Sequence, residues 1–110
     1  MAFRRVADLA DLFVGEKLSV VVDGRRVLVV RLECGVVAYD DRCAHRGAPL
    51  GDGRLDGNVL TCPVHEWSYD LTTGSGVNPE GARLCRLALE VRGSDVLVDV
   101  APADPRGALR

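Results

Sequence analysis

The sequence predicts an all-β fold in a single domain. Short runs of apolar, mostly β-branched residues are separated by glycine or aspartate, and long stretches with the period of a helix are almost absent. A length of 110 residues suits one domain with its own core. Hydrophobic residues make up 47% of the chain and charged residues 27%, so we expect a globular rather than a disordered protein.

Three consecutive antiparallel strands are predicted in the N-terminal half. Residues 18–22 and 27–32 are apolar runs on either side of Asp23-Gly24, which is a strong signal for a hairpin turn. Cys34-Gly35 predicts a second turn, which leads into a third strand at residues 36–39.

A second hairpin is predicted near the C-terminus. Residues 84–91 alternate between apolar and polar with one slip, a turn follows at residues 92–95, and residues 96–100 return as a strand. Residues 101–110 contain two prolines and no pattern, which predicts a flexible tail. At the other end of the chain, residues 6–13 could form one short helix, although two aspartates there could equally mark turns.

Charge and hydropathy exclude several kinds of partner. The formal net charge is -2, from 14 basic and 16 acidic residues that are scattered over both halves, so we expect no nucleic-acid partner. Asp8 and Asp11 interrupt the N-terminal stretch before it reaches signal length, and no segment approaches the roughly 20 apolar residues of a membrane span. We therefore expect a soluble, cytoplasmic protein without a membrane partner. In that setting its four cysteines are metal ligands or free thiols rather than a disulfide framework.

Two short motifs predict a metal site. Cys43-Ala-His45 and Cys62-Pro-Val-His65 each place one thiolate and one imidazole on a tight loop. In a Rieske 2Fe-2S centre one iron is bound by two thiolates and the other by two imidazoles, so each loop can give its cysteine to one iron and its histidine to the other. The four residues are therefore the predicted ligands of one 2Fe-2S cluster.

Two other interpretations of these residues stay open at this point. A Cys2His2 set also binds structural zinc, but common zinc sites pair cysteine with cysteine and histidine with histidine, whereas each loop here mixes the two. Alternatively, the four residues bind no metal and are ordinary core or surface residues. The remaining cysteines, Cys34 and Cys85, have no matching ligand partners and are interpreted as free thiols.

The stretch around the second motif, R-G-A-P-L-G-D-G-R-L-D-G-N-V-L-T-C-P-V-H-E-W-S-Y-D-L-T-T-G, closely resembles the Rieske 2Fe-2S family in the form of bacterial oxygenase ferredoxins. The resemblance covers residues 39–81 specifically. It implies an antiparallel β sandwich over residues 1–100, with a small cluster-binding subdomain at about residues 40–81 and the histidines at its exposed tip. Further residues implied to lie around the cluster are Arg46, Gly47, Pro63, Trp67, Tyr69 and Pro79, the last in a third, proline-containing loop.

The same resemblance suggests how the cluster is tuned. High-potential members of the family have an extra cysteine in each ligand loop and join the two by a disulfide, whereas Ala48 and Val64 stand at those positions here. A serine hydroxyl donor of those members is replaced by Trp67, which favours a lower potential. Tyr69 stands where oxygenase ferredoxins more usually have phenylalanine, and we expect its hydroxyl to raise the potential modestly. The alternative is that the Tyr69 ring only packs, with its hydroxyl in solvent.

The predicted function is electron transfer without substrate chemistry. All four predicted iron ligands are protein side chains, which leaves no open position for a substrate. The H-x-W-x-Y and G-x-N-P patterns resemble the ferredoxin component of toluene-type monooxygenases, which implies a monomeric one-electron carrier between an NAD(P)H-dependent flavin reductase and an aromatic-hydroxylating oxygenase. Two alternatives are the ferredoxin of an aromatic-ring dioxygenase and, by a weaker resemblance, the small Rieske subunit of a nitrite reductase-like complex.

Overall fold

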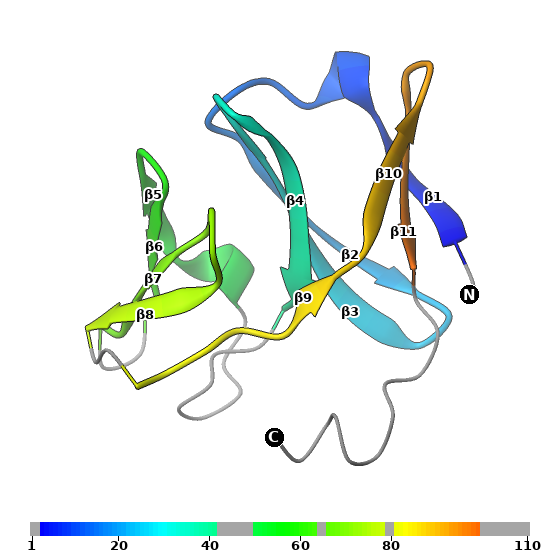
Figure 1. The fold of residues 1–110 in the computed structure, drawn as a ribbon. Coiled ribbons are helices and arrows are strands. Elements are labelled where there is room, and N and C mark those ends of the chain that lie inside the picture. Colours follow the sequence, from blue (N-terminus) through cyan, green and yellow to red (C-terminus); the bar gives the residue numbers. More distant parts are fainter. Residues whose placement is uncertain (1–2, 42–49, 64–65, 79–80, 100–110) are drawn as a thin grey trace.

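In the computed structural model of the chain, the strands form three antiparallel sheets, one of which lies between the other two (Figure 1). The structure describes residues 3–41, 50–63, 66–78 and 81–99. The predicted all-β fold is confirmed: the described helical turns are two short 3-10 segments, Leu9–Asp11 and Leu50–Asp52. No helix in the described part of the chain is long and apolar enough to cross a membrane. The predicted tail at residues 101–110 lies outside the described residues.

The middle sheet confirms the three predicted N-terminal strands. Its strands, in the order β2-β3-β4-β9, are β2 (Lys17–Val22), β3 (Arg25–Leu32), β4 (Gly35–Asp40) and β9 (Arg86–Leu87). Asp23 and Gly24 make the tight turn between β2 and β3, with φ angles of 51° and 80°. Both angles lie in the left-handed region that a two-residue hairpin of this type requires, and aspartate and glycine are among the residues that tolerate it.

A second sheet has the order β1-β11-β10, made of β1 (Phe3–Asp8), β10 (Leu89–Arg92) and β11 (Asp95–Asp99). The predicted C-terminal hairpin is present as β10 and β11, but the strand predicted at residues 84–91 is divided at Ala88. The part before Ala88 is β9, which pairs with β4, and the part after it is β10, which pairs with β11. The slip in the sequence alternation, between Leu84 and Leu87, lies before this division and does not mark it.

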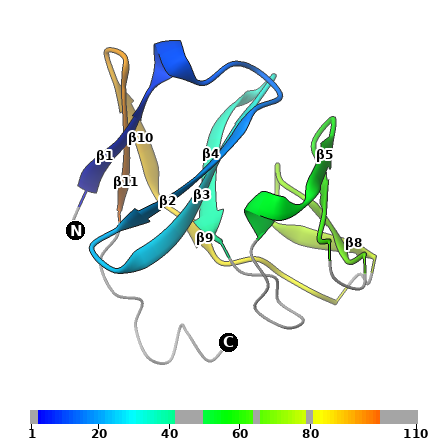
Figure 2. The same cartoon turned by 180° about the vertical axis from the view of Figure 1, so that it is seen from behind.

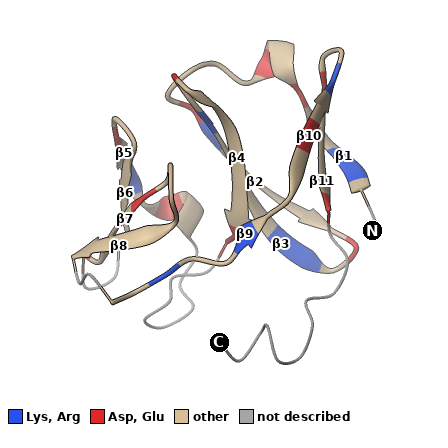
Figure 3. Ribbon diagram, viewed as in Figure 1, with Lys and Arg blue, Asp and Glu red and all other residues tan. Residues whose placement is uncertain are grey.

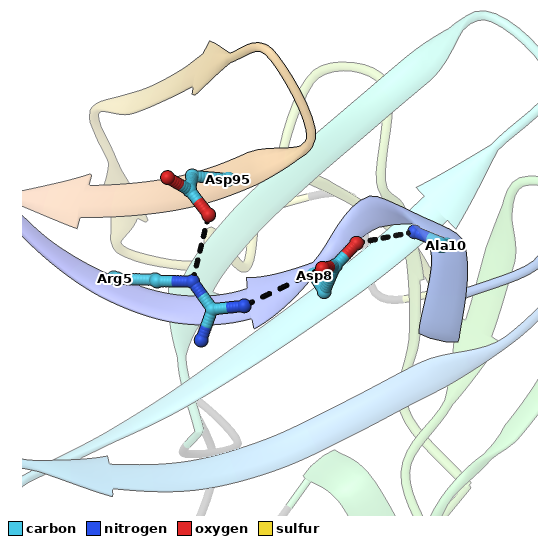
Figure 4. A network of polar contacts seen from close by, with 4 residues as sticks. All are labelled: Arg5, Asp8, Ala10 and Asp95. Carbon is cyan, nitrogen blue, oxygen red and sulfur yellow. Dashed lines mark hydrogen bonds and ion pairs between the residues drawn. The ribbon is translucent and has the colours of Figure 1, made fainter.

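The helix considered at residues 6–13 is not formed. The chain instead runs as β1 and then a single 3-10 turn, Leu9–Asp11, because β1 pairs with β11 from the far end of the sequence. The Asp8 carboxylate caps this turn by accepting a 2.9 Å hydrogen bond from the Ala10 amide. Figure 4 shows how Arg5 ties the two strands: its Nε lies 2.8 Å from Oδ1 of Asp95, and its Nη2 lies 3.6 Å from Oδ2 of Asp8.

The third sheet lies on the opposite side of the middle sheet from the β1-β11-β10 sheet (Figures 1 and 2). Its strands follow one another in the order β5-β6-β7-β8, with bounds β5 (Arg54–Asp56), β6 (Val59–Thr61), β7 (Ser68–Asp70) and β8 (Ser75–Asn78). All of them fall within the segment that the sequence assigns to the cluster-binding subdomain.

Two hydrophobic cores lie on opposite faces of the middle sheet. Leu28, Val30 and Tyr39 face the third sheet, where they pack in one core with Leu60, Tyr69 and Leu71, among others. The alternate residues Val27, Val29 and Ala38 face the β1-β11-β10 sheet and pack in the other core. Because neighbouring side chains of a strand point to opposite faces, β3 is apolar at every position from 27 to 30, and all four are completely buried.

Candidate metal centre

Of the four predicted metal ligands, Cys62 lies in the described part of the chain. It directly follows β6 and is completely buried. Cys43, His45 and His65 lie outside the described residues, as do Arg46, Gly47 and Pro79 from the set expected around the cluster. Within the described ranges, no group of three or more histidine, cysteine, aspartate or glutamate side chains could hold a metal ion.

The loop that contains Cys62 is closed by the backbone. The Cys62 amide donates a 2.7 Å hydrogen bond to the carbonyl oxygen of Trp67, directly beyond the paired residues Thr61 and Ser68 of β6 and β7. Glu66 adopts a left-handed conformation, with φ of 55°, which turns the chain back toward β7. Cys62 and Trp67, which stand on either side of the predicted ligand His65 in the sequence, are therefore held close together by their backbone hydrogen bond.

Cys62 lies in the core between the middle and third sheets, together with Leu60 and Tyr69. Trp67 packs against the same core while remaining partly exposed, whereas Pro63 is exposed. The surroundings of the Cys62 side chain are thus apolar and closed to water. Low solvent access around sulfur is one of the means by which a protein sets the potential of an iron-sulfur cluster.

Tyr69 is completely buried. Its hydroxyl therefore lies inside the protein, and the alternative that placed this hydroxyl in solvent is wrong. Since β7 runs beside β6, with Tyr69 paired to Leu60, the tyrosine belongs to the strand next to the one that ends at Cys62. This position is compatible with the expected influence of Tyr69 on the cluster.

Asp41 and Gly51 stand on either side of the segment that contains the first motif. Oδ1 of Asp41 accepts a 2.8 Å hydrogen bond from the Gly51 amide, and Nζ of Lys17 donates a 2.7 Å hydrogen bond to the Gly51 carbonyl oxygen. Asp41 is only 2% exposed, and it is the only buried charged residue in the described part of the chain. The bond joins the chain just before the first motif to the chain just after it.

Arg26 of β3 completes the surroundings of Asp41. Its carbonyl oxygen accepts a 3.1 Å hydrogen bond from the Asp41 amide, and its Nη2 lies 4.0 Å from Oδ2 of the Asp41 carboxylate. The next acid along the chain, Asp40, is bound differently, by Arg25 through contacts of 2.8 and 3.1 Å. This hydrogen bond raises the pKa of the Arg25 guanidinium.

Sequence reasoning did not single out Asp41, Lys17 or Gly51 as site residues. Nothing in the pair Asp40-Asp41 distinguishes the buried carboxylate from its ion-paired neighbour, because the difference arises only when Gly51 is brought beside Asp41. The structure agrees with the interpretation of Cys34 and Cys85 as free thiols, because both are exposed and neither forms a disulfide bond. Although Cys85 as a whole is exposed, partial burial of its thiol, followed by the nearby Asp40 carboxylate, raises the pKa of that thiol.

The donor set fits a Rieske cluster. Two thiols and two imidazoles occur in mixed pairs along the chain, as ligation of one iron by sulfur and the other by nitrogen requires. The described part of the site agrees with this chemistry, because Cys62 sits in an apolar core at the start of a closed loop. The stem of the other loop is tied by Asp41 and Gly51.

Comparisons with known proteins agree with this chemistry. The family model described as "Rieske [2Fe-2S] domain" matches residues 2–88. The ferredoxin component of the alkene monooxygenase system of Xanthobacter autotrophicus (strain ATCC BAA-1158 / Py2) is 35% identical over 103 residues, which cover 93% of this chain and 84% of that protein.

Solved structures show the same fold. The ferredoxin of carbazole 1,9a-dioxygenase from Nocardioides aromaticivorans IC177 superposes with a TM-score of 0.80 at 31% identity, over 89% of this chain and 97% of that one. A chain in the complex of reduced oxygenase and oxidized ferredoxin in carbazole 1,9a-dioxygenase superposes with a TM-score of 0.81 at 30% identity, over 87% of this chain and 91% of that one.

Proposed function

This chain belongs to the Rieske 2Fe-2S domain family, and we propose that it is the ferredoxin of a multicomponent oxygenase, passing single electrons to the oxygenase component. It is an electron carrier rather than a catalyst. The observation that supports this best is the similarity along nearly the whole length of the chain to ferredoxin components of oxygenase systems. The cofactor is one 2Fe-2S cluster of the Rieske type, which accepts and releases one electron.

Four residues are proposed to bind the cluster: Cys43, His45, Cys62 and His65. Each motif supplies one thiolate and one imidazole, so together they satisfy both irons and leave no position for a substrate. Of these, Cys62 is supported by its burial and its closed loop. Arg46, Gly47, Pro63, Trp67, Tyr69 and Pro79 are proposed to surround the cluster.

Two partners are proposed. The oxygenase is supported by the solved complex of a ferredoxin with its oxygenase in carbazole 1,9a-dioxygenase, in which a chain superposes on this one. A flavin-containing NAD(P)H reductase is proposed as the electron donor, because a one-electron carrier needs a donor that splits the electron pair of the nicotinamide. We further propose that the protein works as a monomer in the cytoplasm, exchanging these partners through small, transient interfaces.

Two kinds of oxygenase compete as the electron acceptor. The 35% identity to the alkene monooxygenase ferredoxin favours a monooxygenase, and we propose an aromatic-hydroxylating one of the toluene type. A ring-hydroxylating dioxygenase is the second candidate, supported by the 31% identity to the carbazole dioxygenase ferredoxin.

Electron paramagnetic resonance tests the cluster assignment. Protein purified anaerobically and reduced with dithionite is expected to give the signal of a 2Fe-2S cluster with mixed ligation, whose average g value lies below that of an all-thiolate cluster. Cys62→Ser should lose this signal and Cys85→Ser should keep it, because Cys85 has no ligand role. A colourless protein that contains stoichiometric zinc would overturn the proposal.

Electron delivery is tested by stopped-flow oxidation of the reduced protein. It is mixed in turn with the oxygenase component of an alkene monooxygenase and with that of carbazole 1,9a-dioxygenase. Faster oxidation by the first supports the monooxygenase role, and faster oxidation by the second supports the dioxygenase role. Oxidation by neither, with the cluster intact, would contradict the oxygenase assignment.

A further inference from the structure

We propose that Asp41 is a positioning residue for the cluster, whose carboxylate holds together the two ends of the first ligand segment. The inference rests on the proposed function, since it concerns the binding of that cluster. It follows from the Asp41–Gly51 hydrogen bond and from the burial of the carboxylate.

Burial of a charged carboxylate is unfavourable unless hydrogen bonds replace its water. Asp41 is 2% exposed, and it accepts a 2.8 Å bond from the Gly51 amide while Nη2 of Arg26 lies 4.0 Å away. The short bond is therefore to the backbone of Gly51 rather than to the arginine. The carboxylate therefore holds the main chain at Gly51 in place, which an ion pair with an arginine side chain alone would not do.

The partner backbone of this bond is itself firmly held. Lys17 of β2 donates to the Gly51 carbonyl oxygen, so both polar groups of this residue, N–H and C=O, are bound by side chains. Gly51 also packs directly against Ser19, because a Cβ at this position would overlap the serine side chain. Asp41 thus bonds to a residue, Gly51, whose backbone is already held by Lys17 of the middle sheet.

The two ligand loops are closed in chemically different ways. The loop of Cys62 is closed by a main-chain bond to Trp67, which no side-chain substitution removes. The stem of the other loop is joined by the side chain of Asp41, two residues before Cys43. A single substitution can therefore loosen one half of the ligand set while leaving the closure of the other half intact.

Two substitutions at this position separate the hydrogen bond from the charge. Asp41→Asn retains an oxygen that can accept from the Gly51 amide, whereas Asp41→Ala removes the acceptor. Loss of a group that hydrogen-bonds a metal ligand directly typically weakens metal binding about 10-fold to 100-fold, and Asp41 acts one step further away, through the Gly51 backbone. We expect Asp41→Ala to lose its cluster roughly 10-fold faster than wild type and to broaden the resonance of the reduced cluster. Asp41→Asn should stay close to wild type in both measurements.

Matched controls exclude a general loss of stability. Asp40→Asn changes the neighbouring carboxylate, which binds Arg25, and should leave cluster retention and the resonance line shape unchanged. Tyr39→Phe lowers stability by removing the hydrogen bond to the Leu71 carbonyl, leaves the Asp41–Gly51 bond in place, and should also leave the line shape unchanged. Lys17→Met releases the Gly51 carbonyl and should speed cluster loss in the same direction as Asp41→Ala, by a smaller factor.

The experiment measures the decay of the cluster absorbance and the resonance spectrum of the reduced protein for each variant. If Asp41→Ala retains its cluster and line shape like wild type, the positioning role is overturned. If Asp41→Ala does not fold, Lys17→Met decides: faster loss than in Asp40→Asn supports the role, and equal loss overturns it. A wild-type protein without the cluster signal would overturn the proposed function, and the positioning role with it.

Discussion

The hydroxyl of Tyr39 on β4 donates a 2.6 Å hydrogen bond to the carbonyl oxygen of Leu71, which follows β7. Both residues are completely buried, and the bond joins the middle sheet to the third sheet across their shared core. The Arg86 guanidinium lies 6.0 Å from the centre of the Tyr39 ring and also donates to the Thr72 carbonyl oxygen. Tyr39 thus links the middle sheet to the third sheet.

Tyr39→Phe is expected to destabilise the protein by about 1–3 kcal/mol, because the buried Leu71 carbonyl loses its donor. For a domain of this size, each kcal/mol lowers the melting temperature by roughly 4 °C or more. The measurement is a thermal melt of the cluster-loaded protein, with Val21→Ala as the control, since Val21 is 68% exposed. Equal melting of Tyr39→Phe and the control would show that the bond contributes little.

Gly74→Ala is expected to cost more stability than Gly57→Ala. Both glycines have positive φ, 81° and 61°, so both substitutions pay about 1–2 kcal/mol for the left-handed backbone. A Cβ at Gly74 would also come within 3.1 Å of Cε1 of Tyr39, whereas Gly57 faces open space. Thermal melts of the two variants measure the difference, and an equal loss would mean that the Tyr39 ring shifts freely.

Tyr69→Phe is expected to lower the midpoint potential of the cluster. The buried hydroxyl can stabilise the more negative, reduced cluster by roughly 1 kcal/mol, which corresponds to about 40 mV for one electron. Protein-film voltammetry measures the potential, and Tyr39→Phe serves as the control because its hydroxyl is already bound to Leu71. An unchanged potential in Tyr69→Phe would remove the tuning role of this hydroxyl.

Cys34 is expected to react with iodoacetamide faster than Cys85 at mildly alkaline pH. Only the thiolate reacts, and partial burial of the Cys85 thiol together with the Asp40 carboxylate raises its pKa, so less of it is ionised at a given pH. Because the pKa of Cys85 is raised, its labelling rate should still increase with pH above the ordinary pKa of a thiol. Peptide mass spectrometry after timed labelling measures both rates, and Asp40→Asn should speed the labelling of Cys85. Faster labelling of Cys85 than of Cys34 in the wild type would contradict this.

The strands that sequence reasoning placed correctly are those with local signals. The turn at Asp23-Gly24 needs only two adjacent residues with the right backbone preferences, and the flanking strands then pair without reference to the rest of the chain. β1 has no such signal. Its pairing partner is β11, with Arg5 opposite Leu97, and nothing near residues 6–13 indicates that distant contact.

The candidate site shows the same division. The two Cys/His motifs can be read directly because the ligand types and their spacing are local. The burial of Asp41 and the enclosure of the Tyr69 hydroxyl depend on how three sheets pack, which a single sequence does not display. The acids Asp40 and Asp41 are identical in type and adjacent, yet one is paired with Arg25 and the other bonds the backbone of Gly51.

The middle sheet serves two cores, and this has a consequence for the fate of the protein in a cell. The core on the cluster side contains a proposed iron ligand, Cys62, whereas the described residues of the core on the other side include no cysteine or histidine. If iron is scarce and the third sheet separates, Leu28, Val30 and Tyr39 change from interior to surface. Such an apolar face invites aggregation and proteolysis. Iron supply is therefore expected to govern the amount of this protein as well as its redox activity.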